Sequence, residues 1–354
     1  MAVRLRSDLD ALPEYRAGRR PQPGPDGRMV KLSSNENPFP PLPSVVAAIA
    51  AEAANVRQYP DPASTRLIES ISTFIGASTD RIAVGTGAVS IVTYLALAAA
   101  GPGDEIVYAW RSFEAYPIVT ALSGARSIPV PLMSDGRHDV AAMAAAVTDR
   151  TRLVFLCSPN NPTGPTLWRE EVRTFLDAVP DDLLVVLDEA YAEYVRDPFA
   201  VNGIRDFKDR DNVLVLRSFS KAYGLAGLRV GYAVGPTDVI ARVRSVSLPF
   251  GVTDIAAAAV DASLAAFDEL QQRVDTVVAE RERVVGELTR LGFDIPATEA
   301  NFYWLPLGGD AAAFTEQCEA LGITVRPFAD EGVRVTVGAP EDNDLVVSVA
   351  ATFI

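Results

Sequence analysis

The chain has 354 residues, 49% of them hydrophobic, so it can bury a large core in one large domain or in two of ordinary size. Its 32 Lys and Arg residues against 46 Asp and Glu residues give a formal net charge of −14. A field of that sign repels nucleic acid and anionic membrane surfaces, which argues against both as partners. Any small anionic substrate must therefore be attracted by arginines gathered locally at a site.

The N-terminal residues 1–30 are rich in Pro, Arg and Gly, which indicates an extended arm with little regular structure of its own. The arm lacks the apolar core of a signal peptide, and polar residues interrupt the most apolar helical stretch, 88–100, so we expect no membrane span. The two cysteines, Cys157 and Cys318, have no disulfide-like spacing. We expect them to be small buried residues of a cytoplasmic protein.

From about Ser44, short apolar runs alternate with longer helix-like segments such as 89–100 and 169–179. Runs that are apolar throughout are typical of strands buried on both faces of a mostly parallel sheet, whose neighbours need helical crossovers. The pattern therefore predicts an α/β fold. The candidate strands are Arg81–Val84, Glu105–Tyr108, Arg126–Leu132, Leu153–Cys157, Leu183–Leu187 and Val213–Leu216.

Beyond Gly235 the sequence becomes Ala-rich and charged from about Asp254 to Leu291, which predicts one long helix leading out of the sheet domain. A smaller α+β unit follows, with strands at 301–305, 323–326 and 333–337 and a helix at 311–321. We therefore predict three parts: residues 1–43 as an N-terminal arm and a segment joining the small domain, 44–250 as a large domain, and 251–354 as a small C-terminal domain.

Unusual residues follow the predicted central strands, where ligands bind in open α/β sheets. After the first of these strands, Gly85-Thr86-Gly87-Ala88 leads into a helix, so free backbone N–H groups and the positive helix end could bind an anion such as phosphate. A single Gly-X-Gly turn is more often only a turn. The segment is therefore a weak signal by itself.

Two further strand ends carry polar groups. The loop Ser158-Pro-Asn-Asn-Pro-Thr-Gly164 has a backbone restricted by two prolines, and its Asn161 could offer an oriented amide, although an ordinary tight loop is the simpler interpretation. Asp188 ends a strand expected to be buried, and a buried carboxylate needs a partner. Either it pairs with a structural arginine or it faces a cationic ligand atom.

The segment after the last central strand is the most informative. A lysine is usually a solvated surface charge, but Lys221 follows hydroxyl residues at a strand end and precedes a Gly-rich, apolar turn. Such a site suits an amine with a lowered pKa that can attack a carbonyl group. Eight residues later, Arg229 could return to the same crevice and bind phosphate.

This segment, Ser218-Phe-Ser-Lys221-Ala-Tyr-Gly-Leu-Ala-Gly-Leu-Arg229, resembles the cofactor-lysine signature of fold-type I pyridoxal-phosphate aminotransferases, particularly the histidinol-phosphate aminotransferase branch. Within that branch, residues 110–116 and 335–343 look most like those of the actinobacterial aromatic amino acid aminotransferases. The resemblance extends over almost the whole chain. The other matching motifs, in the expected order, are Ser34-Asn-Glu-Asn-Pro-Phe39, Tyr59-Pro-Asp61, Gly85-Thr-Gly87, Pro159-Asn-Asn-Pro-Thr-Gly164, Asp188-Glu-Ala-Tyr191, Ala300-Asn-Phe302 and Gly332-Val-Arg334-Val-Thr-Val-Gly338.

The resemblance implies pyridoxal 5′-phosphate as cofactor and assigns residues to it. Lys221 would hold it as a Schiff base, and an ionised Asp188 would keep its pyridine nitrogen protonated, so that the ring accepts electrons from the substrate. Asn161 and Tyr191 would bond the ring 3-oxygen, and Phe113 would stack on the ring face. The phosphate group would lie against Gly87, Ala88, Val89, Ser218, Ser220 and Arg229, together with Tyr59 of a neighbouring subunit, which implies a homodimer with shared sites.

Substrate residues follow from the same resemblance. Arg334 is the candidate for the substrate α-carboxylate, because a guanidinium group can bind a carboxylate through two parallel hydrogen bonds. Arg326 would bind a second anionic group, that of glutamate or a phosphate. Tyr15 of the N-terminal arm would close over the side-chain pocket, and Asn35 completes the expected substrate-binding set.

The expected function is transfer of the amino group of phenylalanine or tyrosine to 2-oxoglutarate by a ping-pong mechanism. The main alternative is histidinol phosphate as amino donor. Where many histidinol-phosphate enzymes have a small residue followed by acidic ones, this chain has Ala88-Val89-Ser90, which favours the aromatic assignment. A non-catalytic cofactor-binding regulator is a third hypothesis, and decarboxylation or β-elimination with the same cofactor is a fourth.

The single histidine, His138, lies in the turn-like sequence Ser-Asp-Gly-Arg-His-Asp and is expected to be solvated. With one histidine and two distant cysteines, the sequence offers no metal-binding cluster. Serine–histidine hydrolysis likewise lacks its usual general base.

Overall fold

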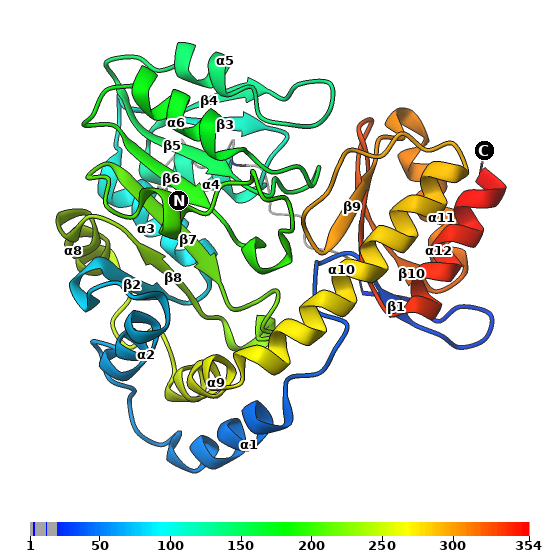
Figure 1. The fold of residues 1–354 in the computed structure, drawn as a ribbon, viewed down its shortest axis with the longest axis horizontal. Helices are drawn as coiled ribbons and strands as arrows, with labels where there is room; N and C mark the ends of the chain where they lie inside the picture. Colours follow the sequence, from blue (N-terminus) through cyan, green and yellow to red (C-terminus); the bar gives the residue numbers. More distant parts are fainter. Residues whose placement is uncertain (1–2, 4–11, 13–19, 354) are drawn as a thin grey trace.

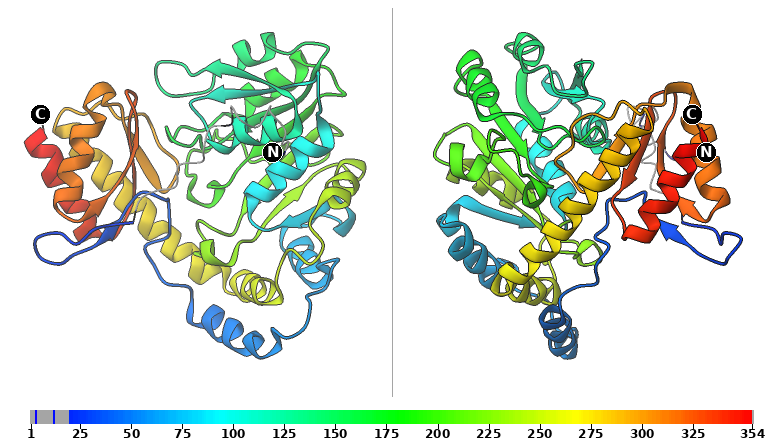
Figure 2. Two further views of the ribbon diagram at one scale, coloured as in Figure 1. Left: turned by 180° about the vertical axis from the view of Figure 1, so that it is seen from behind. Right: turned by 45° about the vertical axis from the view of Figure 1, so that its right-hand side comes forward.

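The computed structural model describes Val3, Leu12 and residues 20–353, which form two α/β parts joined by the long helix α10 (Phe267–Arg290) (Figure 1). The larger part holds the main sheet. The smaller part, which contains the C-terminus, packs beside it, and both further views show α10 running between the two (Figure 2). Within the described residues, no helix is both long and apolar enough to cross a membrane.

The main sheet has seven strands in the order β2-β8-β7-β6-β5-β3-β4. Neighbours from β7 to β4 are parallel, while β8 is antiparallel to both β7 and β2. The predicted, mostly parallel α/β sheet is therefore confirmed, although the short strand β8 had not been predicted. The strands are β2 (Ile82–Gly85), β3 (Glu105–Trp110), β4 (Arg126–Pro131), β5 (Thr151–Cys157), β6 (Leu184–Asp188), β7 (Val213–Ser218) and β8 (Gly231–Val234).

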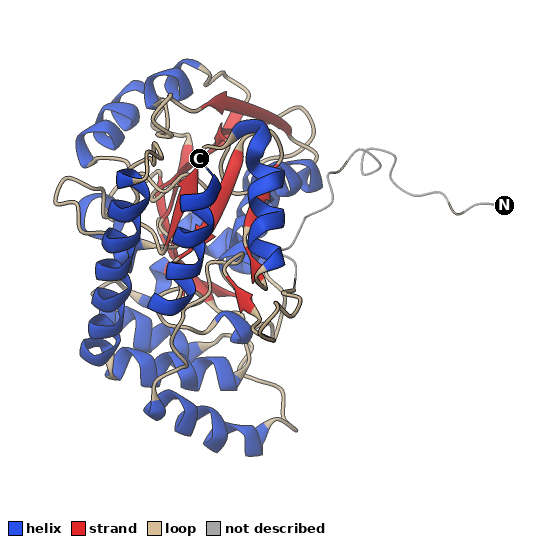
Figure 3. Cartoon of the chain, turned by 90° about the vertical axis from the view of Figure 1, so that its right-hand side faces the viewer, coloured by secondary structure: helices blue, strands red, loops and turns tan. Residues whose placement is uncertain are grey.

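Helices cover both faces of this sheet, as the cartoon in Figure 3 shows. Along β5, Leu153 and Phe155 pack into the core beneath one face, and Val154 and Leu156 pack into the core beneath the other. Two buried faces explain why the strands are apolar at nearly every position. The helices of this part are α1 (Pro43–Glu52), α2 (Thr65–Ile75), α3 (Ala88–Ala99), α4 (Ala115–Ser123), α5 (Val140–Ala145), α6 (Arg169–Ala178), α7 (Gly203–Phe207) and α8 (Thr237–Val246).

The smaller part is α+β, with an antiparallel sheet in the order β11-β12-β9. The short strand β1 (Val30–Lys31) pairs with β10 (Ile323–Thr324), so residues just before the large part begin in the small one. The remaining elements are β9 (Phe302–Leu305), α11 (Ala311–Ala320), β11 (Arg326–Phe328), β12 (Gly332–Thr336) and α12 (Pro340–Phe353).

The helix predicted over 254–291 is in fact two helices, α9 (Asp254–Ala265) and α10, with a break at Ala266. Helix α9 packs against α1 and α2 below the main sheet, whereas α10 crosses to the small part. The single-helix prediction is wrong. The residues around Ala266 are good helix formers, so the sequence does not indicate the break, which we attribute to packing. The domain division at residue 250 stays a prediction.

A buried ion pair follows the central strands. Arg217, on β7, donates to Glu189 through Nη2 at 2.7 Å and Nε at 2.8 Å, and Glu189 also accepts from the Gly203 backbone N–H at 2.6 Å. The two side chains are 10% and 1% exposed. We expect Glu189→Ala to lower the free energy of unfolding by about 3 kcal/mol, because buried Arg217 would lose its hydrogen-bonded carboxylate and keep only Glu193, at 3.9 Å, as an acidic partner.

Urea unfolding of the Glu189→Ala variant would measure this change. Asp177→Ala, which removes the exposed pair with Arg210, is the matched control and should change stability by less than about 1 kcal/mol. Equal effects of the two substitutions would contradict the assigned role of burial.

Candidate active site

The polar strand ends predicted from the sequence meet in one cavity of about 570 Å³ at the carboxyl edge of the main sheet. Its wall combines residues from several strand ends of the large part with residues 33–36 and β11–β12 of the small part. Such an edge is where open α/β sheets bind ligands. The predicted residues that line it are Asn35, Ala88, Val89, Phe113, Asn161, Asp188, Tyr191, Ser218, Ser220, Lys221, Arg229, Arg326 and Arg334.

Two predicted residues of the described part of the chain do not line the cavity. Gly87 lies immediately behind its wall, at the start of α3. Tyr59 is 84% exposed and its ring packs against Phe250 at 5.0 Å, outside the cavity. Tyr15 lies outside the described residues.

The Lys221 amine is enclosed. Its Nζ donates to the Ser34 carbonyl oxygen at 3.1 Å. Burial lowers the pKa of this amine to about 7, and the positive charges of Arg334 and Arg229 act in the same direction. A substantial fraction of Lys221 is therefore an uncharged nucleophile near neutral pH, as the predicted chemistry requires.

The two carboxylate oxygens of Asp188 differ in their hydrogen bonding. Oδ2 accepts a hydrogen bond from the Tyr116 hydroxyl at 2.7 Å, while Oδ1 is buried without a hydrogen-bond partner among the described residues. Burial raises the pKa of this carboxyl to about 6. Arg217 pairs with Glu189 instead, so no arginine of the described residues takes the structural role that the simpler interpretation required.

Asn161, Tyr191 and Arg334 form a connected polar wall. Arg334 donates to Asn161 Oδ1 at 2.5 Å and to the Ser33 carbonyl oxygen at 2.7 Å. Asn35 donates to the Tyr191 hydroxyl at 2.9 Å. Both of these Arg334 acceptors are neutral oxygens, which suits a guanidinium group that is to receive a carboxylate.

Arg326 stands in a different environment. Its Nη2 donates to the Glu114 carboxylate at 2.7 Å, and Phe328 lies beside it with its ring centroid 5.4 Å from the guanidinium carbon. The charge of Arg326 is thus already matched by a carboxylate from the start of α4. Arg326 and Arg334 therefore donate to different kinds of acceptor within the cavity.

The remaining end of the cavity can receive a phosphate. Gly87 has φ +83° and ends the turn before α3, and a Cβ there would lie 2.4 Å from Arg229 Nη2. Glycine therefore lets the Arg229 guanidinium approach the free N–H groups of the first helical turn. Arg229 also lies 3.4 Å from the Ser220 hydroxyl, and the Ser218 hydroxyl accepts from the Ser220 N–H at 3.1 Å.

His138 is buried, which corrects the prediction that it is solvated. The turn before it folds inward, because Thr163 donates to the Gly136 carbonyl oxygen at 2.8 Å. Nε2 lies 3.0 Å from Asn160 Oδ1, so that nitrogen carries the proton, while Nδ1 is buried without a partner among the described residues. Burial lowers the pKa of His138 to about 4.

We expect this histidine to make the protein less stable as the pH falls. Its folded-state pKa of about 4 lies below the ordinary value of 6.5, so below pH 6.5 the unfolded chain takes up a proton that the folded chain does not. The His138 contribution to the free energy of unfolding should fall by about 2 kcal/mol between pH 7 and pH 5. Urea unfolding of wild type and His138→Gln at both pH values would measure it. Parallel pH dependences would contradict the assignment.

Several residues of the site were not predicted. Ser34, Glu114 and Tyr116 lie inside the motifs quoted above, but nothing in their spacing indicated contacts with Lys221, Arg326 and Asp188. Asn160 was passed over in favour of its neighbour, although it joins Ser112 and His138 in one buried network.

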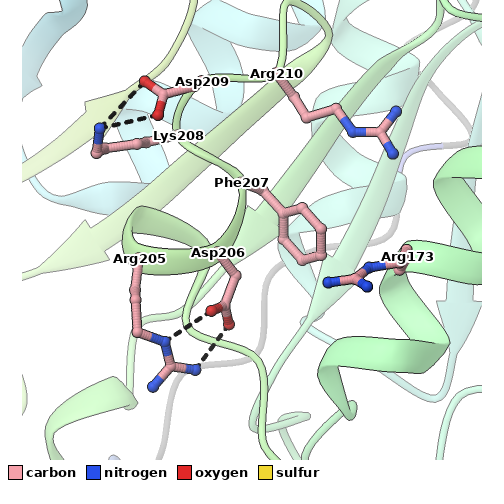
Figure 4. A pocket seen from close by; sticks show the side chains of 7 residues that line it. All are labelled: Arg173, Arg205, Asp206, Phe207, Lys208, Asp209 and Arg210. Atoms are coloured by element: carbon pink, nitrogen blue, oxygen red, sulfur yellow. Dashed lines mark hydrogen bonds and ion pairs between the residues drawn. The ribbon is translucent and has the colours of Figure 1, made fainter.

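A second recess precedes β7 at the opposite edge of the sheet, and Figure 4 shows its basic side chains. Each cation there has an acidic partner. Arg205 pairs with Asp206 at 2.7 Å and Lys208 with Asp209 at 3.0 Å. Arg210 pairs with Asp177 at 2.8 Å, and Arg173 lies 3.6 Å from Glu170. The cavity at the carboxyl edge is therefore a stronger candidate for a ligand-binding site than this recess.

Comparison with known proteins shows the family of this chain. The family described as "Aminotransferase class I and II" matches residues 27–349. An aromatic amino acid aminotransferase of Thermobifida fusca is 54% identical over 349 residues, covering 99% of this chain and 97% of that protein. One from Streptomyces coelicolor is 51% identical over 350 residues, covering 99% and 97%. The crystal structure of a histidinol-phosphate aminotransferase from Sinorhizobium meliloti, in complex with pyridoxal-5′-phosphate, superposes with a TM-score of 0.90 at 27% identity, covering 100% of this chain and 98% of that one.

Proposed function

This chain belongs to the class I and II aminotransferase family and is a pyridoxal-phosphate-dependent transaminase, and we propose that it transfers the amino group of phenylalanine or tyrosine to 2-oxoglutarate. The observation that carries the substrate assignment is the near-full-length similarity to aromatic amino acid aminotransferases. Similarity to the histidinol-phosphate enzyme is more distant.

The described residues fit the cofactor. The unpartnered Oδ1 of Asp188 suits the pyridine nitrogen, Lys221 suits its aldehyde carbon, and Asn161 and Tyr191 suit the ring 3-oxygen. Phe113 lines the cavity where it could cover the ring. The residues suited to the phosphate group are Gly87, Ala88, Val89, Ser218, Ser220 and Arg229.

When bound, pyridoxal phosphate supplies an electron sink for the electrons released as the substrate Cα–H bond breaks. The Lys221 amine is the group placed to take the proton from Cα and return it, because its pKa of about 7 leaves it uncharged part of the time. Asp188, as a carboxylate, stabilises a positive ring nitrogen. Ping-pong kinetics follow if the same groups act in reverse on the 2-oxo acid.

Substrate recognition is assigned to residues of both parts of the molecule. Arg334 would bind the α-carboxylate that amino acids and 2-oxo acids share, with Asn35 beside it. Phe113, Val92 and Phe328 give the cavity apolar surface for an aromatic ring. Arg326 would meet the distal carboxylate of 2-oxoglutarate, whereas the Glu114 carboxylate at 2.7 Å opposes a phosphate dianion more strongly, which favours phenylalanine and tyrosine over histidinol phosphate.

The deciding experiment compares phenylalanine, tyrosine and histidinol phosphate as amino donors to 2-oxoglutarate, using the purified holoenzyme. We expect kcat/KM to be higher for the two aromatic amino acids, with equal amounts of 2-oxo acid and glutamate formed. Preference for histidinol phosphate would overturn the substrate assignment. Carbon dioxide or ammonia as the main product would instead indicate decarboxylation or elimination.

A homodimer with shared sites is part of the proposal, as is a cytoplasmic location. Tyr59 is exposed and lies outside the cavity of its own chain, so it could reach a phosphate only in another copy. We expect sedimentation to give about twice 37.8 kDa, and Tyr59→Phe to weaken cofactor binding about fivefold through loss of one hydrogen bond. A fully active monomer, or unchanged cofactor affinity in the variant, would refute this assignment.

A further inference from the structure

Tyr116 lies on α4 behind the cavity wall and is fully buried. Its ring stacks on Phe155 with centroids 4.5 Å apart and planes within 4°. It also contacts Phe113 edge to face, at 5.6 Å and 88°. Packing on two sides restricts the ring, so the position of its hydroxyl is well defined.

The hydroxyl makes the hydrogen bond to Asp188 Oδ2 at 2.7 Å described above. Burial, and next the negative charge of Asp188, raise the pKa of Tyr116 well above its ordinary value. The phenol therefore keeps its proton and always acts as donor. The neighbouring Cys157 thiol also stays protonated, because burial raises its pKa to about 12.

We propose that Tyr116 is a positioning residue for catalysis, which keeps Asp188 ionised and oriented by binding one carboxylate oxygen and leaving the other for the cofactor ring nitrogen. The inference rests on the proposed function, since it assigns that nitrogen to Asp188. Through its contact with Phe113, the same side chain also supports the residue expected on the ring face. Tyr116 itself does not line the cavity.

The direction of the effect follows from hydrogen bonding. A donor to a carboxylate stabilises the ionised form and lowers its affinity for a proton. With Tyr116 in place, the proton shared between Asp188 and the ring nitrogen is held on the nitrogen. Without the hydroxyl, the buried carboxylate loses this donor, and the proton moves toward Asp188.

The test is Tyr116→Phe, with Tyr108→Phe as matched control. Tyr108 is a buried tyrosine of the same aromatic cluster, 5.9 Å from Tyr116 between ring centroids, but it does not line the cavity. Each protein would be loaded with pyridoxal phosphate labelled with ¹⁵N in the ring, and the ring signal recorded by NMR. Equilibrium dialysis would give cofactor affinity, and kcat and KM would be measured separately.

We expect the ring ¹⁵N signal of Tyr116→Phe to move toward that of a neutral pyridine. Cofactor affinity should fall roughly tenfold, the magnitude typical of a hydrogen bond to a charged group, and kcat should fall while KM changes little. Tyr108→Phe should match wild type in the first two measurements. A wild-type ¹⁵N signal in Tyr116→Phe, or an equal shift in Tyr108→Phe, would overturn the proposal.

Different results would overturn the proposed function and the role of Tyr116. Wild-type protein that binds no pyridoxal phosphate would overturn the proposed function, and this inference with it. Wild-type protein that binds the cofactor and transaminates, but whose ring nitrogen is unaffected by Tyr116→Phe, would overturn only the role of Tyr116.

Discussion

Replacing Lys221 by alanine is expected to abolish transamination, lowering kcat by at least about 10⁴-fold, because the variant loses both the amine that binds the cofactor and the group that moves the Cα proton. The lowered pKa of this amine, about 7, is what makes both tasks feasible near neutral pH. Steady-state rates with phenylalanine and 2-oxoglutarate would measure the loss. A variant with near-normal turnover would refute the assignment of Lys221.

The Lys221→Arg variant tests whether a positive charge without a reactive amine supports activity. Arginine keeps the positive charge in the cavity but is never deprotonated in proteins, so we expect it to be as inactive as alanine. Borohydride reduction of the wild-type holoenzyme should attach the cofactor mass to the peptide that holds Lys221. Lys208→Ala is the surface control, because Lys208 pairs with the exposed Asp209 in the recess at the opposite edge of the sheet, and it should retain activity.

Replacing Arg334 by alanine is expected to lower kcat/KM by about 10²–10³-fold for both the amino acid and the 2-oxo acid. The substrate carboxylate would lose two charge-assisted hydrogen bonds in a buried site, and such truncations typically cost several kcal/mol. Because both substrates carry this carboxylate, both Michaelis constants should rise. Cofactor affinity should change little, since Arg334 is assigned to the substrate.

Arg334→Lys tests the geometry of this site. Lysine restores a positive charge without the two-pronged guanidinium, so we expect only partial recovery of kcat/KM. Arg196→Ala removes an arginine whose partner Asp275 is exposed and should leave the kinetics unchanged. If Arg334→Ala left the Michaelis constants of every substrate unchanged, the carboxylate assignment would be wrong.

The proposed arrangement would let a single cavity serve two successive substrates. The residues proposed for the cofactor come mainly from strand ends of the large part, while Arg326 and Arg334 come from β11 and β12 of the small part, where they face each other in register. Arg334 donates to Asn161 and to the Ser33 carbonyl oxygen, and Arg326 donates to Glu114. In this proposal, Arg334 would bind the carboxylate that both substrates share, and Arg326 would respond to the group in which they differ.

Sequence alone determined six of the seven strands of the main sheet, all but β8, and the residues that follow them. A parallel strand buried on both faces must be apolar throughout, and polar groups after it stand out, so Asp188 and Lys221 could be found from local pattern. Their individual roles came from the long motif resemblance, not from periodicity. Spacing also predicted β9, β12 and α11 of the small unit. The strand expected at 323–326 is instead two short strands, β10 and β11, in different sheets, and α12 was not predicted.

Tertiary structure decided the features that depend on contacts between distant segments. The break at Ala266 arises because α9 packs on α1 and α2, and the burial of His138 arises because its turn folds under the Asn160 loop. Neither feature leaves a local signal in the sequence. The residues around Ala266 would suit an unbroken helix, and the residues around His138 would suit an exposed turn. The hydrogen bond between Tyr116 and Asp188 joins residues 72 positions apart in the sequence. Only the folded chain brings the phenol of α4 against the carboxylate at the end of β6.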